Sequence, residues 1–305
     1  MDKTLPTPRS PAGIGRRDIL TAVSLLSVAS LAGTEVHASG SRGVVPAGID
    51  LKDPEFNLSV LSRLQGDVRE KVTYGFHFGQ VFGIKNGKDL ALTEYGRRIY
   101  GYEALGVRRA RILPDGSVQS VSRGWLFYTD PETGEYIEKF RNPYTNVMVD
   151  VPVFRAGISG DTMTVKGPQV SANFTMESTI YGRPPRLDYK FFAGQAFVSR
   201  DAFTRWQPRG LPNKRIEMTL DVWQCKAADL FDTSRSHIPS HTTWTSQTEF
   251  QTWLNMPAEF SGHQLWRSDG TRVDRIADLP AHFVARCMAD PALKAALTDP
   301  LVFPA

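Results

Sequence analysis

Short runs in which two kinds of side chain alternate restrict the fold of this chain more than any other feature of its sequence. One run covers residues 72–79, where Val72, Tyr74, Phe76 and Phe78 alternate with Thr73, Gly75, His77 and Gly79. A second run places Ile216, Met218, Leu220 and Val222 on one side and Arg215, Glu217, Thr219 and Asp221 on the other. Successive side chains of a β-strand point to opposite sides of the sheet. Both runs therefore predict strands with two different faces.

Many further strand-like runs separated by turn sequences indicate the fold class. They cover residues 100–113, 118–129, 135–141, 147–154, 162–166, 169–181 and 186–198. Residues 130–134 and 142–146 predict tight turns. We also predict a loop or lid over the Ser- and Thr-rich residues 233–252, and a last hairpin over residues 263–273 with its turn at 268–270. About ten strands with little helix between them favour a mainly β domain over residues 39–305, built as an antiparallel barrel-like (lipocalin-like) sheet or a sandwich.

Two helices are expected, one at each end of this domain. Apolar residues at helical spacing predict the first over residues 56–64. Residues 279–297 predict the second, with an interruption at Asp290-Pro291. The chain has 305 residues, of which 41% are hydrophobic and 22% charged, so it can bury a core. Its net charge of only +4, without basic runs interleaved with aromatic residues, argues against a nucleic-acid partner.

The N-terminal residues have the layout of an export signal. Arg16 and Arg17 directly precede an apolar stretch over residues 19–33, and Val36 and Ala38 are small residues before a cleavage site. The paired arginines are typical of the twin-arginine export route. A stretch of about 15 residues spans roughly 22 Å as a helix, too short for a stable membrane anchor. We therefore predict a signal over residues 1–38, the twin-arginine export machinery as a partner, and a periplasmic or secreted protein.

Cysteine and histidine positions give little support for a metal or cofactor. Cys225 and Cys287 lie in no C-x-x-C pair, and two alternatives stay open for them: one disulfide or two buried free thiols. His237 and His241 have the spacing of a helical metal pair, but Pro239 between them disfavours a helix. Nucleotide-binding and zinc-protease motifs are absent from the sequence. We expect no cofactor and no metal.

Three segments of the chain resemble a known family. They are residues 100–109, residues 125–135 together with 141–145, and residues 244–262, which contain Trp-Leu-Asn-Met at 253–256. These segments are similar to the bacterial and fungal family known as domain of unknown function 1838. The resemblance covers most of residues 65–275. It implies a shared fold and export by a twin-arginine signal, and it brings no reaction with it.

Candidate site residues come from the strand faces that carry polar side chains. The candidate catalytic residues are Glu103, Tyr128 and Asp221. In a cavity, burial raises a carboxylate pKa toward the range useful for proton transfer, and a tyrosine donates to a ligand oxygen. The candidate ligand-binding residues supply hydroxyl, amide and charged groups and aromatic rings: Tyr102, Arg109, Asn142, Tyr144, Glu217, Trp223, Trp244 and Trp253. In the simpler alternative, these charges face water and the aromatic rings pack in the core.

Three functions remain open from the sequence. The first is a cofactor-independent isomerase, lyase or cyclase that acts on an apolar or aromatic molecule, and it requires a carboxylate in the cavity. The second is a non-catalytic periplasmic protein that binds such a molecule through an apolar lining with hydroxyl and amide donors. The third is a structural protein of the cell envelope, which has a filled interior and an exposed apolar patch.

Overall fold

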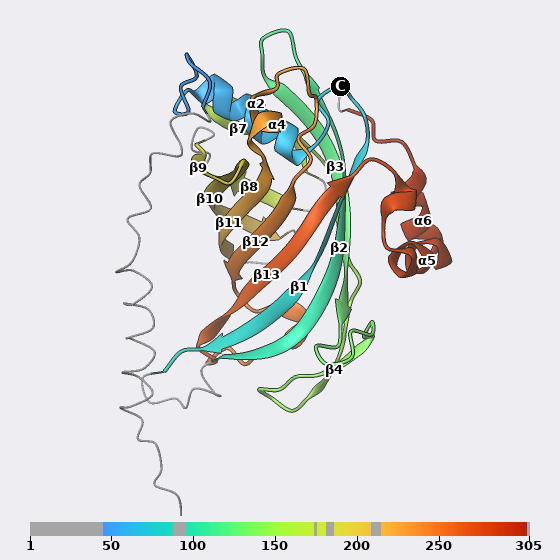
Figure 1. Cartoon of the computed structure of the whole chain (residues 1–305). Coiled ribbons are helices and arrows are strands. Elements are labelled where there is room, and N and C mark those ends of the chain that lie inside the picture. Colours follow the sequence, from blue (N-terminus) through green and yellow to red (C-terminus); the bar gives the residue numbers. More distant parts are fainter. Residues whose placement is uncertain (1–44, 88–95, 174–175, 181–185, 209–214, 304–305) are drawn as a thin grey trace, which may run out of the picture. The chain divides into compact units, whose positions relative to one another are not determined.

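Antiparallel strands make up most of the molecule (Figure 1). The computed structural model describes residues 45–87, 96–173, 176–180, 186–208 and 215–303. The predicted signal over residues 1–38 and its cleavage site lie outside them. Eleven strands form one sheet: β1 (Thr73–Lys85), β2 (Gly96–Ile112), β3 (Val118–Thr129), β6 (Phe154–Thr164), β7 (Gly167–Asn173), β8 (Met176–Ile180), β9 (Asp188–Phe192), β10 (Gln195–Pro208), β11 (Arg215–Lys226), β12 (His241–Thr248) and β13 (Gly262–Val273). Two short strands, β4 (Lys139–Arg141) and β5 (Met148–Asp150), pair separately.

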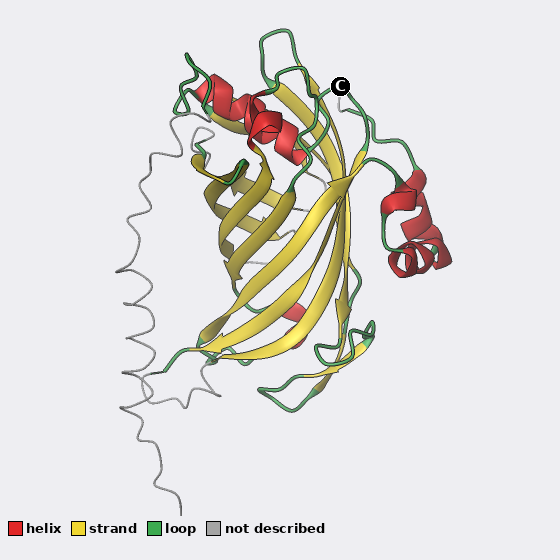
Figure 2. Ribbon diagram, in the orientation of Figure 1, coloured by secondary structure: helices red, strands yellow, loops and turns green. Residues whose placement is uncertain are grey.

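The order of the strands makes one strongly curved, open sheet. The strands run β7-β6-β3-β2-β1-β13-β12-β11-β10-β8, and β9 pairs with β10 beside β8. In Figure 2, β10, β11 and β12 lie across from β2 and β3. The two end strands, β7 and β8, follow one another in the chain, and no ladder joins them among the described residues. The prediction of a mainly β, antiparallel fold is confirmed.

Helix α2 (Pro54–Gln65) lies across one end of the curved sheet (Figure 1). Its start follows from local chemistry, because Asp53 accepts a hydrogen bond from the Glu55 amide (3.0 Å) and Pro54 occupies the first helical turn. The buried Arg63 guanidinium donates to the carbonyl oxygens of Leu230 (3.1 Å) and Asp232 (2.8 Å). These bonds tie α2 to the short helix α4 (Ala227–Phe231), which directly follows β11.

Helices α5 (Ala281–Ala289) and α6 (Pro291–Thr298) cover the side of β1–β3 that faces away from β10–β12 (Figure 1). We call this side of the sheet the outer face, and the opposite side the inner face. The Phe283 ring is fully buried and packs edge-on against Phe76 (5.1 Å between ring centroids) and Phe127 (5.3 Å). Asp290 caps α6 by accepting from the Ala292 amide at 2.8 Å, with Pro291 at the first position. The predicted interruption of the C-terminal helix is therefore confirmed.

Two predictions for the C-terminal third were wrong. The Ser- and Thr-rich segment expected as a loop contains β12, whose threonines suit a strand because they are β-branched. The hairpin expected over residues 263–273 is the single strand β13, with no turn at 268–270. β13 pairs with β1 on one side and with β12 on the other. Ladders on both sides outweigh the local turn preference of Ser-Asp-Gly.

The two cysteines are buried free thiols, one of the alternatives that the sequence left open. Cys225 lies on β11, whereas Cys287 lies on α5 and accepts a hydrogen bond from the Trp125 indole (3.2 Å). Within the described ranges, the helices are too short and too polar to cross a lipid bilayer.

Candidate functional site

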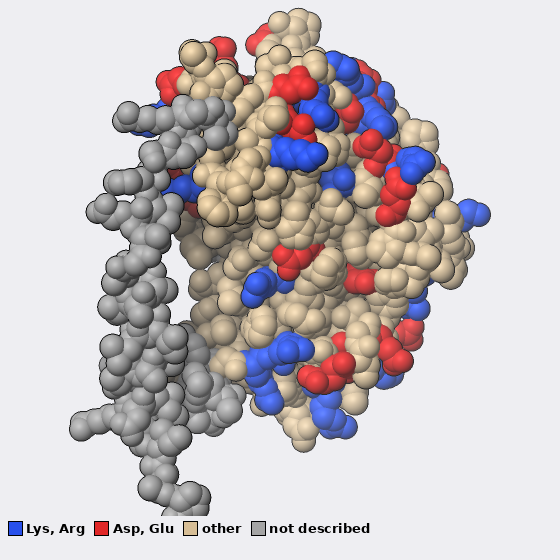
Figure 3. All heavy atoms as spheres, in the orientation of Figure 1, with Lys and Arg blue, Asp and Glu red and all other residues tan. Residues whose placement is uncertain are grey.

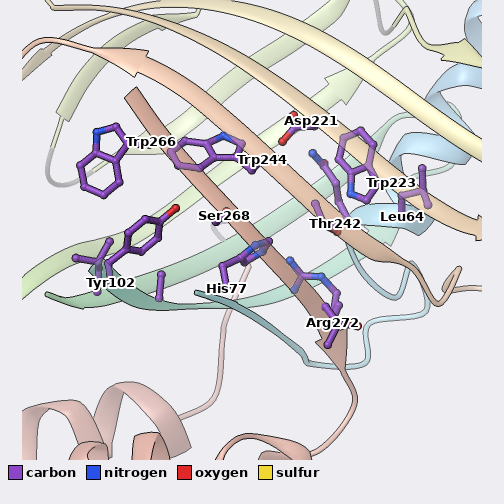
Figure 4. A pocket seen from close by; sticks show the side chains of 14 residues that line it. Leu64, His77, Tyr102, Asp221, Trp223, Thr242, Trp244, Trp266, Ser268 and Arg272 are labelled. Carbon is purple, nitrogen blue, oxygen red and sulfur yellow. The ribbon is translucent and has the colours of Figure 1, made fainter. Parts of the chain in front are cut away.

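A cavity of about 330 Å³ lies inside the curve of the sheet, under the end of α2 (Figure 4). Its size falls at the lower end of the range for small-molecule sites. Side chains from β1, β2 and β3 line one wall, and side chains from β11, β12 and β13 line the other. The lining residues are Leu64, Gln65, His77, Tyr102, Ala104, Leu126, Asp221, Trp223, Thr242, Trp244, Trp266, Ser268, Thr271 and Arg272.

Glycines in the sheet make room for two long polar side chains of the cavity. The imidazole of His77 lies across Gly270, where an added Cβ would be 2.4 Å from His77 Nδ1. The guanidinium of Arg272 lies across Gly75, where an added Cβ would be 2.7 Å from Arg272 Nη2. At residue 270 an added Cβ would also lie 2.4 Å from the Phe76 carbonyl oxygen, so this position needs glycine, whereas a side chain at residue 75 would displace the Arg272 guanidinium. The cavity therefore depends on missing side chains as much as on those present.

Arg272 is a cation without a carboxylate partner in the described part of the chain. Its Nη1 donates to the Thr73 hydroxyl at 3.2 Å. Burial, with a smaller contribution from the charge of the neighbouring Arg108, lowers the pKa of Arg272 to about 9. Burial also lowers the pKa of His77 to about 4, and the charge of Arg272 contributes. At neutral pH the cavity thus contains a positively charged guanidinium and an uncharged imidazole.

Asp221 is the carboxylate in the lining, and an arginine neutralises it. It is 7% exposed and accepts from Arg200 Nε at 3.0 Å and from Arg200 Nη2. The Arg200 guanidinium also lies 5.6 Å from the centre of the Trp223 ring. Glu217 lies on the same face of β11 without lining the cavity, and it accepts from the Ser246 hydroxyl at 2.7 Å. Burial raises the pKa of Glu217, and the charge of Asp221 adds to this.

The hydroxyls of Tyr102 and Ser268 lie next to each other in the cavity and have only each other within reach in the described part of the chain. Burial raises the pKa of Tyr102, and the neighbouring Ser268 hydroxyl offsets this only in part. Among the described residues, neither hydroxyl reaches a partner at full hydrogen-bond geometry, although both are buried. Buried polar groups are normally paired, so these two are available to a ligand. Aromatic rings stand beside them, with Trp266 5.0 Å from Tyr102 and 6.4 Å from Trp244 between ring centroids.

A family model described as "Protein of unknown function (DUF1838)" matches residues 79–296, most of the chain. The chain belongs to this family. The matched region begins in β1, two residues after His77, and ends in α6, so it includes both walls of the cavity. No curated protein and no solved structure matches the chain significantly.

Four of the candidate residues from the sequence line the cavity of this DUF1838 protein. They are Tyr102, Asp221, Trp223 and Trp244. Four others lie toward the opposite end of the inner face, in or beside the aromatic cluster formed by Tyr100, Tyr128, Phe140, Trp253 and Trp266. These four are Tyr128, Asn142, Tyr144 and Trp253. Asn142 is fully buried and donates to the Leu254 carbonyl at 2.7 Å, which fixes the turn that carries Trp253.

Glu103 and Arg109 lie on the outer face, away from the cavity. Glu103 accepts hydrogen bonds from Tyr136 and from His282 (2.8 Å), and it thereby joins β2 to α5. Arg109 donates to the carboxylate of Glu70 at 2.7 Å and to the carbonyl of Leu301 at 2.9 Å. The geometry gives both residues contacts that hold the C-terminal segment against the sheet.

The sequence reasoning missed two polar residues of the cavity. His77 and Arg272 were not among the candidates, although both belong to regular alternations. His77 shares its face with Thr73 and Gly75, and Arg272 shares its face with Trp266 and Ser268. A prediction of one continuous strand over residues 262–273 would have placed Arg272 on the same face as Trp266.

A larger groove of about 640 Å³ runs between α2 and the connection of β2 to β3. Its guanidinium groups already have partners, because Arg69 donates to the Ser234 carbonyl at 2.9 Å and Arg63 donates to backbone carbonyls beside α4. The smaller cavity is therefore the better candidate site. Within the described ranges, no three His, Cys, Asp or Glu residues gather as metal ligands would. His237 and His241 instead face Asp274 (3.8 Å) and Asp269 (3.2 Å).

Figure 3 shows how charge is distributed over one face of the molecule. Acidic and basic side chains are intermixed there, and side chains without charge dominate the middle of the face. This pattern agrees with the small net charge of the chain, +4.

Proposed function

We propose that the protein binds a flat apolar or aromatic small molecule in the cavity between the two walls of the sheet. The observation that supports this most is the pair of buried, unpartnered hydroxyls of Tyr102 and Ser268 beside three tryptophans. A ligand oxygen would satisfy these hydroxyls, and the rings of Trp244 and Trp266 would cover an apolar ligand. A filled structural interior would have neither the volume nor the unpaired donors.

The proposal includes a barrel-like, lipocalin-like arrangement of the sheet around this ligand. The two end strands β7 and β8 are consecutive in the chain, and the walls formed by β2–β3 and β11–β12 face each other across the cavity. A sheet that wraps this far encloses a site that water reaches from few directions.

A second candidate function is a cofactor-independent isomerase, lyase or cyclase. The specific observation in its favour is that His77 and Tyr102 line the same cavity in their uncharged forms. With a pKa of about 4, the His77 imidazole is a weak base that accepts a proton only from a strongly acidic carbon of the ligand and readily returns it to the product. The Tyr102 hydroxyl donates a hydrogen bond to the ligand oxygen that gains negative charge. In this version, His77 takes the proton-transfer role that the sequence suggested for a carboxylate, Glu103 or Asp221.

Native mass spectrometry of the protein purified from its source tests the binding proposal. We expect a co-purifying small molecule in the wild type and its loss in Ala104→Phe, because Ala104 lines the cavity and the larger ring fills it. Ala258→Phe, in an exposed loop, is the matched control and should keep the ligand. Binding that survives in Ala104→Phe would place the ligand elsewhere and refute the proposal.

We also propose that the chain is exported by the twin-arginine route to the periplasm or beyond. The support is the Arg16-Arg17 pair before the apolar stretch. Replacing both by lysine should retain the protein in the cytoplasm, whereas Arg9→Lys should leave export unchanged. Cell fractionation measures this, and N-terminal sequencing of the exported protein should start at Ser39. Equal export of both variants would contradict the proposal.

A further inference from the structure

We propose that the ligand of this cavity is a monoanion, a carboxylate on an apolar or aromatic body, and that Arg272 binds its carboxylate group. This inference rests on the proposed binding function and names the class of ligand. The charges around the cavity support it, because the Arg272 guanidinium lines the cavity without an ion pair in the described part of the chain.

The charge of Arg272 has no carboxylate beside it in the described part of the chain. The guanidinium lies across Gly75 and donates one hydrogen bond to the Thr73 hydroxyl, at 3.2 Å. In the described part of the chain no carboxylate lies within ion-pair distance of it. Removing a lone cation from water is costly unless a counter-charge meets it. A bound anion supplies that counter-charge, and the planar guanidinium matches a carboxylate with two parallel hydrogen bonds.

The other titratable groups that line the cavity are paired or uncharged. Asp221 lines the cavity, but Arg200 already neutralises it through two hydrogen bonds. Arg108 points to the same side, and its nearest carboxylate influence is Asp161. His77 is uncharged at neutral pH. Arg108 and Glu217 lie on the same face without lining the cavity, so Arg272 is the uncompensated charge among the lining residues, which fits a single carboxylate better than a doubly charged phosphate ester.

The apolar side chains of the cavity fit the uncharged part of the ligand. Trp244, Trp266 and Leu126 line the cavity between the polar groups. Arg272 and Ser268 are four residues apart on β13, about 13 Å along a strand. A ligand with its carboxylate at Arg272 therefore lays its body across the tryptophans toward the unpartnered hydroxyls of Tyr102 and Ser268. Figure 4 shows these side chains around one space.

The test compares three probes of nearly equal shape: 2-naphthoate, neutral 2-naphthamide and cationic 2-naphthylmethylammonium. Their affinities for the purified protein are measured by isothermal titration calorimetry at pH 7.5. We expect 2-naphthoate to bind at least ten-fold more tightly than 2-naphthamide, and the cation to bind most weakly. Arg272→Gln should abolish the preference while leaving the affinity for 2-naphthamide within about two-fold. Arg272→Lys should restore part of it.

Arg267→Gln is the matched control, because Arg267 lies on the same strand but is exposed on the outer face. This variant should keep the full preference for the anion. The thermal midpoint of Arg272→Gln without any probe should equal or exceed that of the control, because no carboxylate loses its partner.

The outcomes separate this inference from the proposed function. If 2-naphthoate and 2-naphthamide bind equally, or if the cation binds best, the carboxylate inference is overturned while the binding function stands. If none of the three binds, the binding function fails and the inference fails with it. The comparison of the three probes on the wild type decides the matter even if Arg272→Gln does not fold.

Discussion

The two faces of strand β2 serve different purposes, although their residues are neighbours in the sequence. Tyr102 points to the inner face and lines the cavity, where its hydroxyl is buried without a partner. Glu103, the next residue, points to the outer face, where Tyr136 and His282 satisfy it. The outer face is closed by two helices and packed with aromatic rings. The inner face keeps a polar space open, in which the Tyr102 and Ser268 hydroxyls and the Arg272 guanidinium lie.

Whether a polar side chain already has its hydrogen-bond partners depends on which elements pack against its face of the sheet. Glu103 looks like a catalytic carboxylate in the sequence, yet it joins a strand to a helix. Arg272 attracts no attention in the sequence, yet among the described residues that line the cavity it is the cation without an ion pair. If the two faces have separate roles, substitutions on the outer face should change stability and substitutions in the cavity should change binding.

Phe283→Ala should cause the largest loss of stability, about 3–5 kcal/mol, because it empties the centre of the outer-face core between Phe76 and Phe127. Urea unfolding followed by circular dichroism measures this. Val284→Ala, at a partly buried position in the same helix, should cost less. Under conditions where Phe283→Ala is folded, binding of 2-naphthamide should stay within about two-fold of wild type. A large loss of binding in the folded variant would show that the faces are not independent.

Asp221→Asn should destabilise the protein by about 2–3 kcal/mol, because it leaves the Arg200 guanidinium without its carboxylate on the inner wall. The loss is smaller than for a fully buried pair because the Arg200 side chain remains 24% exposed. Asp201→Asn on β10 removes the same charge at an exposed position and should change the unfolding free energy by less than about 0.5 kcal/mol. Equal losses in the two variants would contradict the importance of the pair.

His77 should make the stability fall as the pH is lowered. Its pKa is about 4 in the folded protein, against an ordinary value of 6.5, so the unfolded chain takes up the proton first. Stability is therefore fully present above pH 6.5 and declines from there to pH 4. The decline between pH 7 and pH 5 is up to about 2 kcal/mol. Urea unfolding at several pH values should show a shallower decline in His77→Gln, and His263→Gln should reduce the slope less. An unchanged profile in His77→Gln would mean that the imidazole is solvated.

Glu103→Gln should have the smallest effect, a loss of about 1 kcal/mol, because glutamine still accepts from Tyr136 and the His282 side chain is 61% exposed. Its binding of 2-naphthoate should equal that of wild type. Tyr102→Phe, the adjacent residue on the inner face, should do the reverse and weaken binding several-fold with little change in the thermal midpoint. The comparison fails if Glu103→Gln weakens binding more than Tyr102→Phe does.

The strand pattern of this protein could be predicted because alternation is a local property. Residues 72–79 and 215–222 alternate in the sequence and form parts of β1 and β11. The helix after residue 279 and its break at Pro291 also follow from local spacing and capping. β12 was missed because Ser and Thr were interpreted as loop residues, although Trp244, Ser246 and Thr248 share one side of the segment.

The identity of the inner face could not be predicted, because it depends on distant parts of the chain. Whether Tyr102 or Glu103 faces a cavity is decided by helices α5 and α6, which begin about 180 residues later and cover one side of β2. The separation of Trp253 from Trp244 has a similar cause. Asn142 holds the turn of Trp253 at the far end of the inner face through a contact between segments 112 residues apart.

Strand β1 belongs to both faces at once, since Phe76 packs under α5 while the adjacent His77 lines the cavity. One inserted or deleted residue near the start of this strand would exchange these two side chains, emptying the core and blocking the ligand space in a single event. Insertions and deletions should therefore be tolerated only in the connections between strands, whereas substitutions at Ala104 or Thr242 would reshape the cavity and leave the outer-face core in place.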